Sequence, residues 1–219
     1  MPTPTLAELE LADEPERWAA LGFTIDAERC RLGSVEMSFR DDPGGRRGIL
    51  SWSLRDLGST ELDGLPTAIS ERAPANGQTA HANGALAIDH IVAISPAFER
   101  SVEALQAAGL DLRRVREEPT PAGAPRQAFF RVGEEILELV QEPEEVLERA
   151  GGRERPAHFW GLAVLMENLD EAVAAMAPHV GSVRSAVQPG RRIATVRRSA
   201  GLALPLALMS RDERGGVSA

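Results

Sequence analysis

The sequence predicts an α+β protein in which one supersecondary unit occurs twice. The copies lie 71 residues apart, so that the apolar run around His90 corresponds to the apolar run around Gly161. In each copy this run enters a helical pattern, and three further strand-like runs follow. A unit of one strand, one helix and three strands cannot bury its apolar face alone, and its copy is the expected packing partner.

The individual elements follow from apolar periodicity and from turn residues. The first copy occupies residues 86–150 and ends in a connecting helix that Pro143 opens and Gly151 closes. The second copy occupies residues 151–210. Strands are expected at 87–94, 111–116, 127–132 and 135–140 in the first copy, and at 159–166, 182–187, 192–197 and 202–209 in the second.

The region before the repeat predicts a degenerate N-terminal module over residues 1–57. Pro15 follows Asp13 as a helix start, and strand-like runs lie at 5–11, 29–33, 35–40 and 49–54. Residues 58–85 are rich in Gly, Pro, Asn and Ser, which indicates a linker or a covering loop. We expect residues 211–219 to form a disordered tail.

The repeat resembles a module of the vicinal-oxygen-chelate superfamily, which includes glyoxalase I, the extradiol dioxygenases and the bleomycin-resistance proteins. The run from His90 to Ile94, the helix behind it, the Ala108–Leu110 segment and the run from Ile136 to Val140 carry the resemblance. It covers residues 86–210 and, more weakly, 5–57. It implies paired βαβββ modules that form a cupped mixed sheet with the helices outside.

In catalytic members of that superfamily the cup holds a divalent metal, with one ligand from the first and one from the last strand of each module. His90 and Glu138 stand at these two positions in the first module, as metal ligands or as catalytic residues without a metal. The second module offers Gly161 and a position at or beside Pro205, and no Asp or Glu occurs between residues 172 and 211. Two protein ligands rarely hold a divalent ion firmly. We expect no complete metal site, and a divalent metal held by His90 and Glu138 is the alternative.

Further ligand-binding candidates lie on the expected strands and turns. By alternation, one of Phe129 and Phe130 faces the cup, and the same holds for Phe159 and Trp160. A tight turn at Gln188 delivers Arg191 and Arg192 to a strand start, where a guanidinium could receive a ligand carboxylate or phosphate; the alternative is a solvated basic hairpin. The ligand-binding candidates are Gln127, Phe129, Trp160, Gln188 and Arg192.

Composition limits the partners and the chemistry. A net charge of −9 and a pI near 5.1 argue against nucleic acid and anionic membranes as partners. All 24 basic residues are arginine, which excludes Schiff-base and phosphate-loop lysines. A single cysteine, Cys30, and no signal peptide or membrane span in the sequence favour the cytoplasm.

The sequence therefore predicts a glyoxalase-like protein that binds a small organic molecule in a cup between βαβββ modules. One alternative is a divalent-metal-dependent lyase, isomerase or dioxygenase of the same superfamily. Another is a non-enzymatic assembly module whose cup is filled by its own side chains. The sequence is compatible with a homodimer and leaves the ligand, the reaction and any cofactor unknown.

Overall fold

The computed structural model describes residues 3–74, 77–120 and 123–212, and it contains two β-sheets. Most of the expected tail, residues 213–219, lies outside the described residues. Sheet A is formed by β1 (Thr5–Ala12), β2 (Arg29–Leu32), β3 (Val35–Phe39), β4 (Gly48–Arg55) and β5 (Thr67–Ile69), with helix α1 (Pro15–Ala20). Sheet B is formed by β6 (Ala85–Ser95), β7 (Asp111–Arg116), β8 (Gln127–Val132), β9 (Glu135–Gln141), β10 (His158–Met166), β11 (Arg184–Ser185), β12 (Arg192–Thr195) and β13 (Leu206–Met209).

The helices of the repeat connect the strands of sheet B. They are α2 (Phe98–Ala107), α3 (Glu144–Ala150) and α4 (Leu169–Ala175), with a 3-10 turn η1 (Arg198–Ala200) before β13. Among the described residues, no helix has the length and apolar character needed to cross a membrane.

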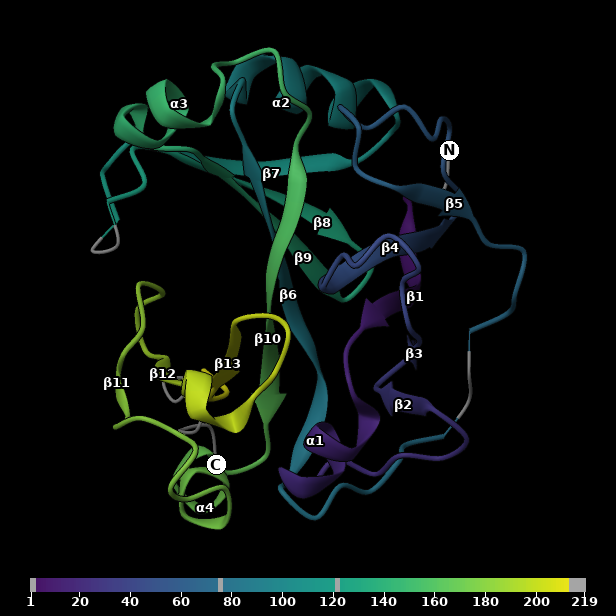
Figure 1. Ribbon diagram of the computed structural model, residues 1–219. Coiled ribbons are helices and arrows are strands. Elements are labelled where there is room, and N and C mark those ends of the chain that lie inside the picture. Colours follow the sequence, from purple (N-terminus) through teal and green to yellow (C-terminus); the bar gives the residue numbers. More distant parts are fainter. Residues whose placement is uncertain (1–2, 75–76, 121–122, 213–219) are drawn as a thin grey trace, which may run out of the picture.

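Sheet B confirms the paired βαβββ modules. Its strand order is β11-β12-β13-β10-β6-β9-β8-β7, so each module contributes four neighbouring strands. The first strands of the modules, β6 and β10, pair antiparallel at the centre, and each pairs in parallel with the last strand of its own module. Figure 1 shows β7–β9 and β11–β13 on either side of the long central strands.

The two central strands carry β-bulges at equivalent positions. His90 pairs with Ala163 and Ile88 with Val164, which leaves Asp89 without a partner. On the other strand, Trp160 is skipped in the same way. Positions 89 and 160 are themselves 71 residues apart, so the two bulges occupy equivalent positions in the two modules.

Some strands of the second module are shorter than the sequence predicts. β11 at the sheet edge contains two residues, and β13 begins at Leu206. Residues 198–205 instead form η1, the left-handed Gly201 (φ 81°) and a segment that ends at Pro205. Proline has no N–H for a sheet ladder, and strands commonly begin after it.

Sheet A departs from the regular module. Its order is β2-β3-β1-β4-β5, so β4 lies on the opposite side of β1 from β3. β4 pairs antiparallel with β1, in the manner in which β10 pairs with β6, and the short β5 pairs in parallel with β4. β5 lies in the segment expected to be a linker, which otherwise returns along sheet A: the Thr24 N–H donates to His81 Nδ1 at 2.9 Å and Arg31 Nε to Thr79 Oγ1 at 3.0 Å.

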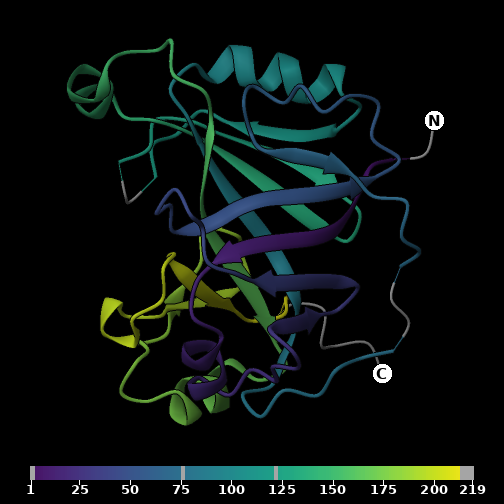
Figure 2. The same ribbon diagram turned by 45° about the vertical axis from the view of Figure 1, so that its right-hand side comes forward.

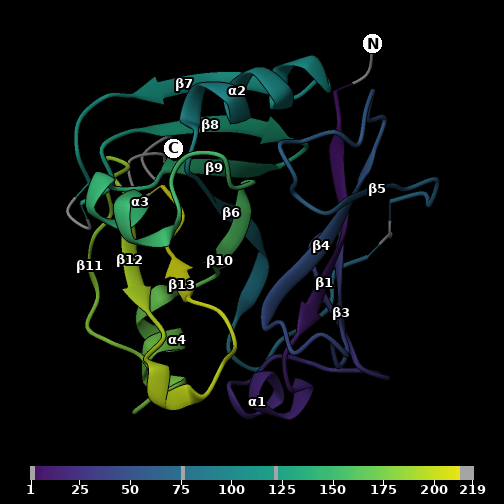
Figure 3. The same cartoon turned by 45° about the horizontal axis from the view of Figure 1, so that its top comes forward.

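One face of sheet B is covered by the helices and by sheet A. The core is one continuous cluster that contains Leu137 and Leu139 of β9, Leu105 of α2 and residues of sheet A. Trp52 of β4 meets Phe159 of β10 edge-on, with ring centroids 5.3 Å apart. Figures 2 and 3 show sheet A stacked against sheet B. Alternation directs Glu138, between Leu137 and Leu139, to the opposite face of sheet B, which we call the cup.

We predict that Gly161→Ala destabilises the protein, because a Cβ atom at position 161 would lie 2.9 Å from the backbone oxygen of Pro205. Relieving such overlap costs about 1–3 kcal/mol of unfolding free energy. For a chain of this size each kcal/mol lowers the thermal midpoint by about 2–4 °C, which calorimetry can measure. Gly181→Ala is the matched control, since a Cβ there meets its nearest atom at 3.4 Å. Equal midpoints for the two variants would contradict the prediction.

A second stability feature is Glu135, at the start of β9. Its side chain is 2% exposed, although its neighbour Glu134 is exposed. Burial raises the pKa of the Glu135 carboxyl to about 7. The folded protein therefore binds a proton more tightly than the unfolded chain, so ionising Glu135 opposes folding. This cost is absent below the ordinary pKa of glutamate, 4.5, and is complete above about 7.

We predict that Glu135→Gln stabilises the protein relative to wild type at pH 8 but not at pH 4. The expected difference in unfolding free energy is on the order of 3 kcal/mol at the higher pH. Urea unfolding at both pH values measures it. Glu134→Gln removes the same charge from an exposed position and should show a much smaller gain, because its charge is a lesser cause of the raised pKa of Glu135 than burial. A gain of equal size would refute the assignment to Glu135.

Candidate functional site

The cup of sheet B contains a cavity of about 330 Å³. Its wall is drawn from both modules, and residues on β6, β7, β8 and β9 meet the loop between β11 and β12. The lining residues are Asp89, His90, Arg114, Phe129, Glu134, Ile136, Gln188 and Arg191.

The bulge in β6 explains why two consecutive residues line this cavity. In a regular strand Asp89 and His90 would point to opposite faces, but a bulge re-aims one side chain. The Asp89 carboxylate lies 2.7 Å from His90 Nδ1 and also accepts a hydrogen bond from Arg191 Nη2. Arg191 is held in turn by the backbone oxygen of Ser210, at 2.8 Å.

The electrostatics of Asp89 are set by these two partners. Burial by itself would raise the pKa of the Asp89 carboxyl, but the hydrogen bonds from His90 and Arg191 outweigh burial and hold this pKa below its ordinary value. Asp89 is therefore a carboxylate at neutral pH, which makes Nδ1 of His90 the protonated nitrogen. Nε2 of His90 is left to face the cup.

Glu138 meets His90 from the neighbouring strand. Its Oε2 lies 3.5 Å from His90 Nε2, and its other oxygen accepts a hydrogen bond from the amide of Gln127. The Gln127 carbonyl accepts from Arg116 at 3.1 Å. A continuous polar chain thus crosses the cup from Arg191 to Arg116, with His90 and Glu138 at its centre.

The apolar part of the wall comes from Phe129 and Ile136. Phe129 pairs directly with Glu138 in the β8–β9 ladder, and Ile136 pairs with His90 in the β6–β9 ladder. Cross-strand partners project from the same face of a sheet, so apolar contact area lies beside both polar groups. This combination of apolar surface and a few convergent polar groups is typical of small-molecule sites.

The structure brings together most of the residues that the sequence selects. His90, Phe129 and Gln188 line the cavity, and Glu138 and Gln127 belong to its polar chain. Two candidates lie elsewhere. Trp160 is 49% exposed and is not part of the cavity wall, while Phe159 packs into the core against Trp52.

Arg192 is the second candidate that the structure places elsewhere. Its Nη1 lies 2.9 Å from both carboxylate oxygens of Asp170, at the start of α4. The residue before it, Arg191, occupies the cavity wall. Adjacent residues of a strand point to opposite faces, so an error of one residue exchanges the two roles.

Sequence reasoning misses Asp89, Arg114, Glu134 and Ile136 as lining residues. Asp89 cannot be recognised from the sequence, because regular alternation would point it to the face opposite His90. No residue pattern predicts the bulge that changes its direction. Of the two arginines that the turn at Gln188 delivers, sequence reasoning selects Arg192, whereas the structure places Arg191 in the cavity wall. Arg114 and Ile136 follow from alternation once the ladder register is known.

The donor set does not fit the divalent metal that the resemblance implies. By ladder register Gly161 matches His90, and Ala207 rather than Pro205 matches Glu138, so the second module supplies no ligand. A side chain at position 161 would also collide with the Pro205 backbone. In the part of the chain that the structure describes, no group of three or more His, Cys, Asp or Glu side chains is arranged to hold a metal ion.

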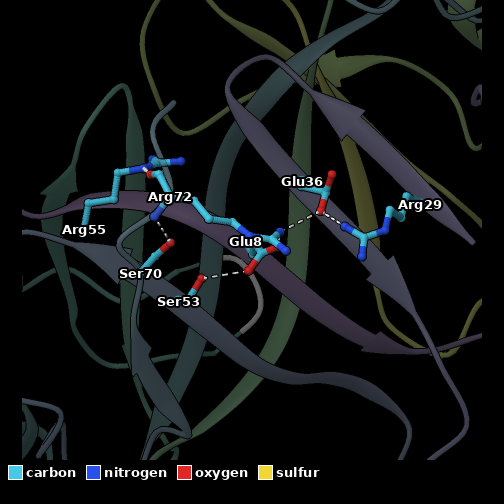
Figure 4. Close-up of polar contacts among 7 residues, drawn as sticks. All are labelled: Glu8, Arg29, Glu36, Ser53, Arg55, Ser70 and Arg72. Atoms are coloured by element: carbon cyan, nitrogen blue, oxygen red, sulfur yellow. Dashed lines mark hydrogen bonds and ion pairs between the residues drawn. The ribbon is translucent and has the colours of Figure 1, made fainter. Parts of the chain in front are cut away.

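Sheet A does not repeat this site. Glu8 follows a bulge in β1 as His90 follows the bulge in β6. Arg72 from the linker is bound by Glu8 and lies 3.3 Å from Glu36, and Arg29 also pairs with Glu36. Figure 4 shows Arg72 reaching between the two carboxylates, with Ser53 beside Glu8. These charges satisfy one another on a half-exposed face.

Comparison with known proteins supports this picture of the fold. The family model described as Glyoxalase/Bleomycin resistance protein/Dioxygenase superfamily matches residues 87–205. No curated protein matches the sequence.

Two of the similar solved structures show which parts of the fold are shared. A mutant of 4-hydroxymandelate synthase from Streptomyces coelicolor is similar at 14% identity and a TM-score of 0.64, over 96% of this chain and 93% of that one. Methylmalonyl-CoA epimerase from Mycobacterium tuberculosis is similar at 13% identity and a TM-score of 0.50, over 62% of this chain and 94% of that one.

At these sequence identities the similarity concerns the fold alone. Because the comparison with 4-hydroxymandelate synthase covers 96% of this chain, the shared fold includes sheet A. The family match covers more than half of the chain and coincides with the two modules of sheet B, whose topology is that of the repeat. The chain belongs to the Glyoxalase/Bleomycin resistance protein/Dioxygenase superfamily.

Proposed function

We propose that this protein binds a small organic molecule in the cup of sheet B, with His90 and Glu138 as the groups that contact its reactive or hydrogen-bonding end. The observation that carries the proposal is the pair of acceptor atoms at the cavity, His90 Nε2 and Glu138 Oε2, which lie 3.5 Å apart. Each is held from behind, His90 by Asp89 and Glu138 by Gln127. Groups fixed in this way are oriented before the ligand arrives.

This geometry supports proton acceptance as the chemistry of the site. Asp89 holds a proton of His90 on Nδ1, and an imidazole that carries no second proton presents a lone pair at Nε2. A ligand O–H, N–H or activated C–H placed between Nε2 and Glu138 could donate to either atom. The names of the solved neighbours, an epimerase and a synthase, support an enzymatic role.

Two alternative functions are a metal-dependent enzyme and an assembly module, and one structural observation bears on each. A metal-dependent enzyme is favoured by the Asp89–His90 contact, since the second ring N–H of a metal-bound histidine commonly donates a hydrogen bond to a carboxylate. It would need ligands that this module pair lacks. An assembly module with a filled cup is disfavoured by the cavity of about 330 Å³. For the compartment we propose the cytoplasm, on the basis of the single, buried Cys30.

Metal analysis tests the absence of a complete metal site. We predict that protein purified without chelator contains well under one equivalent of Zn, Mn, Ni or Fe per chain, because the described residues include no group of three or more potential ligands arranged around a metal ion. Inductively coupled plasma mass spectrometry measures this. A stoichiometric metal that is lost in both His90→Ala and Glu138→Ala would establish the metal-dependent alternative instead.

Substitution of the acceptor pair tests the binding site. In a thermal-shift screen of small organic acids, alcohols, amides and ketones, we expect compounds that stabilise the wild type. Their affinity should fall at least about tenfold in His90→Ala and Glu138→Gln, since each change removes one hydrogen bond to the ligand. The thermal midpoint without ligand should change by no more than a few degrees, because both side chains lie outside the core.

Asp170→Asn is the control for this experiment, because it removes a carboxylate that pairs with Arg192 away from the cavity. It should leave ligand affinity unchanged. If His90→Ala or Glu138→Gln unfolds the protein, these residues are structural and the proposed site is wrong. If no compound in the screen binds, the proposal of a small-molecule cup loses its support.

A further inference from the structure

We propose that Arg114 forms an anion subsite at the outer end of the cup, and that the ligand is therefore a small organic acid. Its carboxylate would bind Arg114, its apolar body would lie on Phe129, and its opposite end would reach His90 and Glu138. This inference rests on the proposed function and deepens it, because it names the class of ligand and its orientation.

The first support is the position of Arg114 in the sheet. Arg114 pairs with Phe129 in the β7–β8 ladder, and Phe129 pairs with Glu138 in the β8–β9 ladder. The three side chains therefore stand in one row on the cup face of three neighbouring strands. Two strand spacings separate the first from the last, which is about 10 Å between their Cα atoms. A molecule of one ring or a few carbon atoms spans such a row.

The second support is the state of the guanidinium groups around the cavity. Arg191 binds Asp89, and Arg116 on the same strand as Arg114 binds Gln127 and Glu118. Arg114 is an exposed residue that lines the cavity, and it makes no hydrogen bond or ion pair with any residue that the structure describes. Its planar fork is thus available for a carboxylate, which it can bind through two parallel hydrogen bonds.

The third support is the distribution of charge along the row. The Asp89 carboxylate is paired with the guanidinium of Arg191, whereas Glu138 receives its hydrogen bond from the uncharged amide of Gln127. An anionic group is therefore repelled from the Glu138 end and attracted to the Arg114 end. The field of the cup fixes the orientation of an organic acid and presents its uncharged end to the acceptor pair.

The experiment compares acids with their neutral amides, which share size and shape. Ligand-observed NMR titrations at constant ionic strength would use propionate and propionamide, benzoate and benzamide, and phenylacetate and phenylacetamide. For at least one pair we expect the acid to bind wild-type protein about ten to a hundred times more tightly than the amide, as for a hydrogen-bonded charge pair. Arg114→Gln should remove this preference and leave the affinity for the amide unchanged.

Arg113→Gln is the matched control. Arg113 is the adjacent residue on β7, is exposed, and pairs with Asp111 at 3.0 Å. The substitution removes the same charge, so a preference for acids that results from net charge would fall equally in both variants. We expect Arg113→Gln to keep the wild-type preference.

Each other outcome overturns the inference. If acids and amides bind equally well, or if Arg114→Gln keeps the preference, no anion subsite exists at Arg114. When binding in those cases is still lost in Glu138→Gln, the proposed function stands and only the anion subsite is wrong. If neither acids nor amides bind, and no compound of the thermal-shift screen binds either, both proposals fall together.

Discussion

The antiparallel pairing of β6 with β10 is the constraint on which the rest of this structure depends. It joins the two modules into one sheet, aligns their first strands and includes a pair of bulges, at Asp89 and Trp160, whose positions are related by the repeat. The bulge in β6 brings Asp89 to the same cavity as His90. Without it Asp89 would point into the core side of the sheet, where an unpaired carboxylate is costly, and His90 would lack the partner that fixes its proton.

The two halves of the cup have the same topology but different side chains. The two modules share their topology, but the position of Asp89 is taken by Trp160 and that of His90 by Gly161. Polar groups converge in the first module, while the second contributes Gln188 and Arg191 from a loop. The second module thus serves the site by supporting Asp89 through Arg191 rather than by repeating the acceptor pair.

Sequence reasoning predicts the fold well and the site in part. The 71-residue repeat and the apolar runs locate the strands of sheet B, because period-2 burial is a local property of the chain. The topology of sheet A escapes it, since the pairing of β4 with β1 joins segments far apart in the chain and no local pattern displays it. Within the site, His90, Glu138, Gln127 and Phe129 follow from strand position.

The residues that escape sequence reasoning do so because they depend on register. Asp89 requires a bulge, and Arg191 and Arg192 exchange places by one residue. A shift of that size changes no composition or periodicity that a sequence displays, yet it moves a side chain to the other face of the sheet. Arg114 becomes a candidate only when the ladder aligns it with Phe129 and Glu138.

The close approach of Gly161 to the Pro205 backbone has a consequence for how such proteins can diversify. A symmetric, two-sided ligand set cannot be regained through one substitution at position 161, because any side chain there meets a backbone oxygen that is held in a parallel ladder. Strand β13 would have to move first, and that change alone would weaken the sheet. A two-sided ligand set is therefore reached only through a variant with a weakened sheet, so the cup is held to one side by the packing of its own backbone.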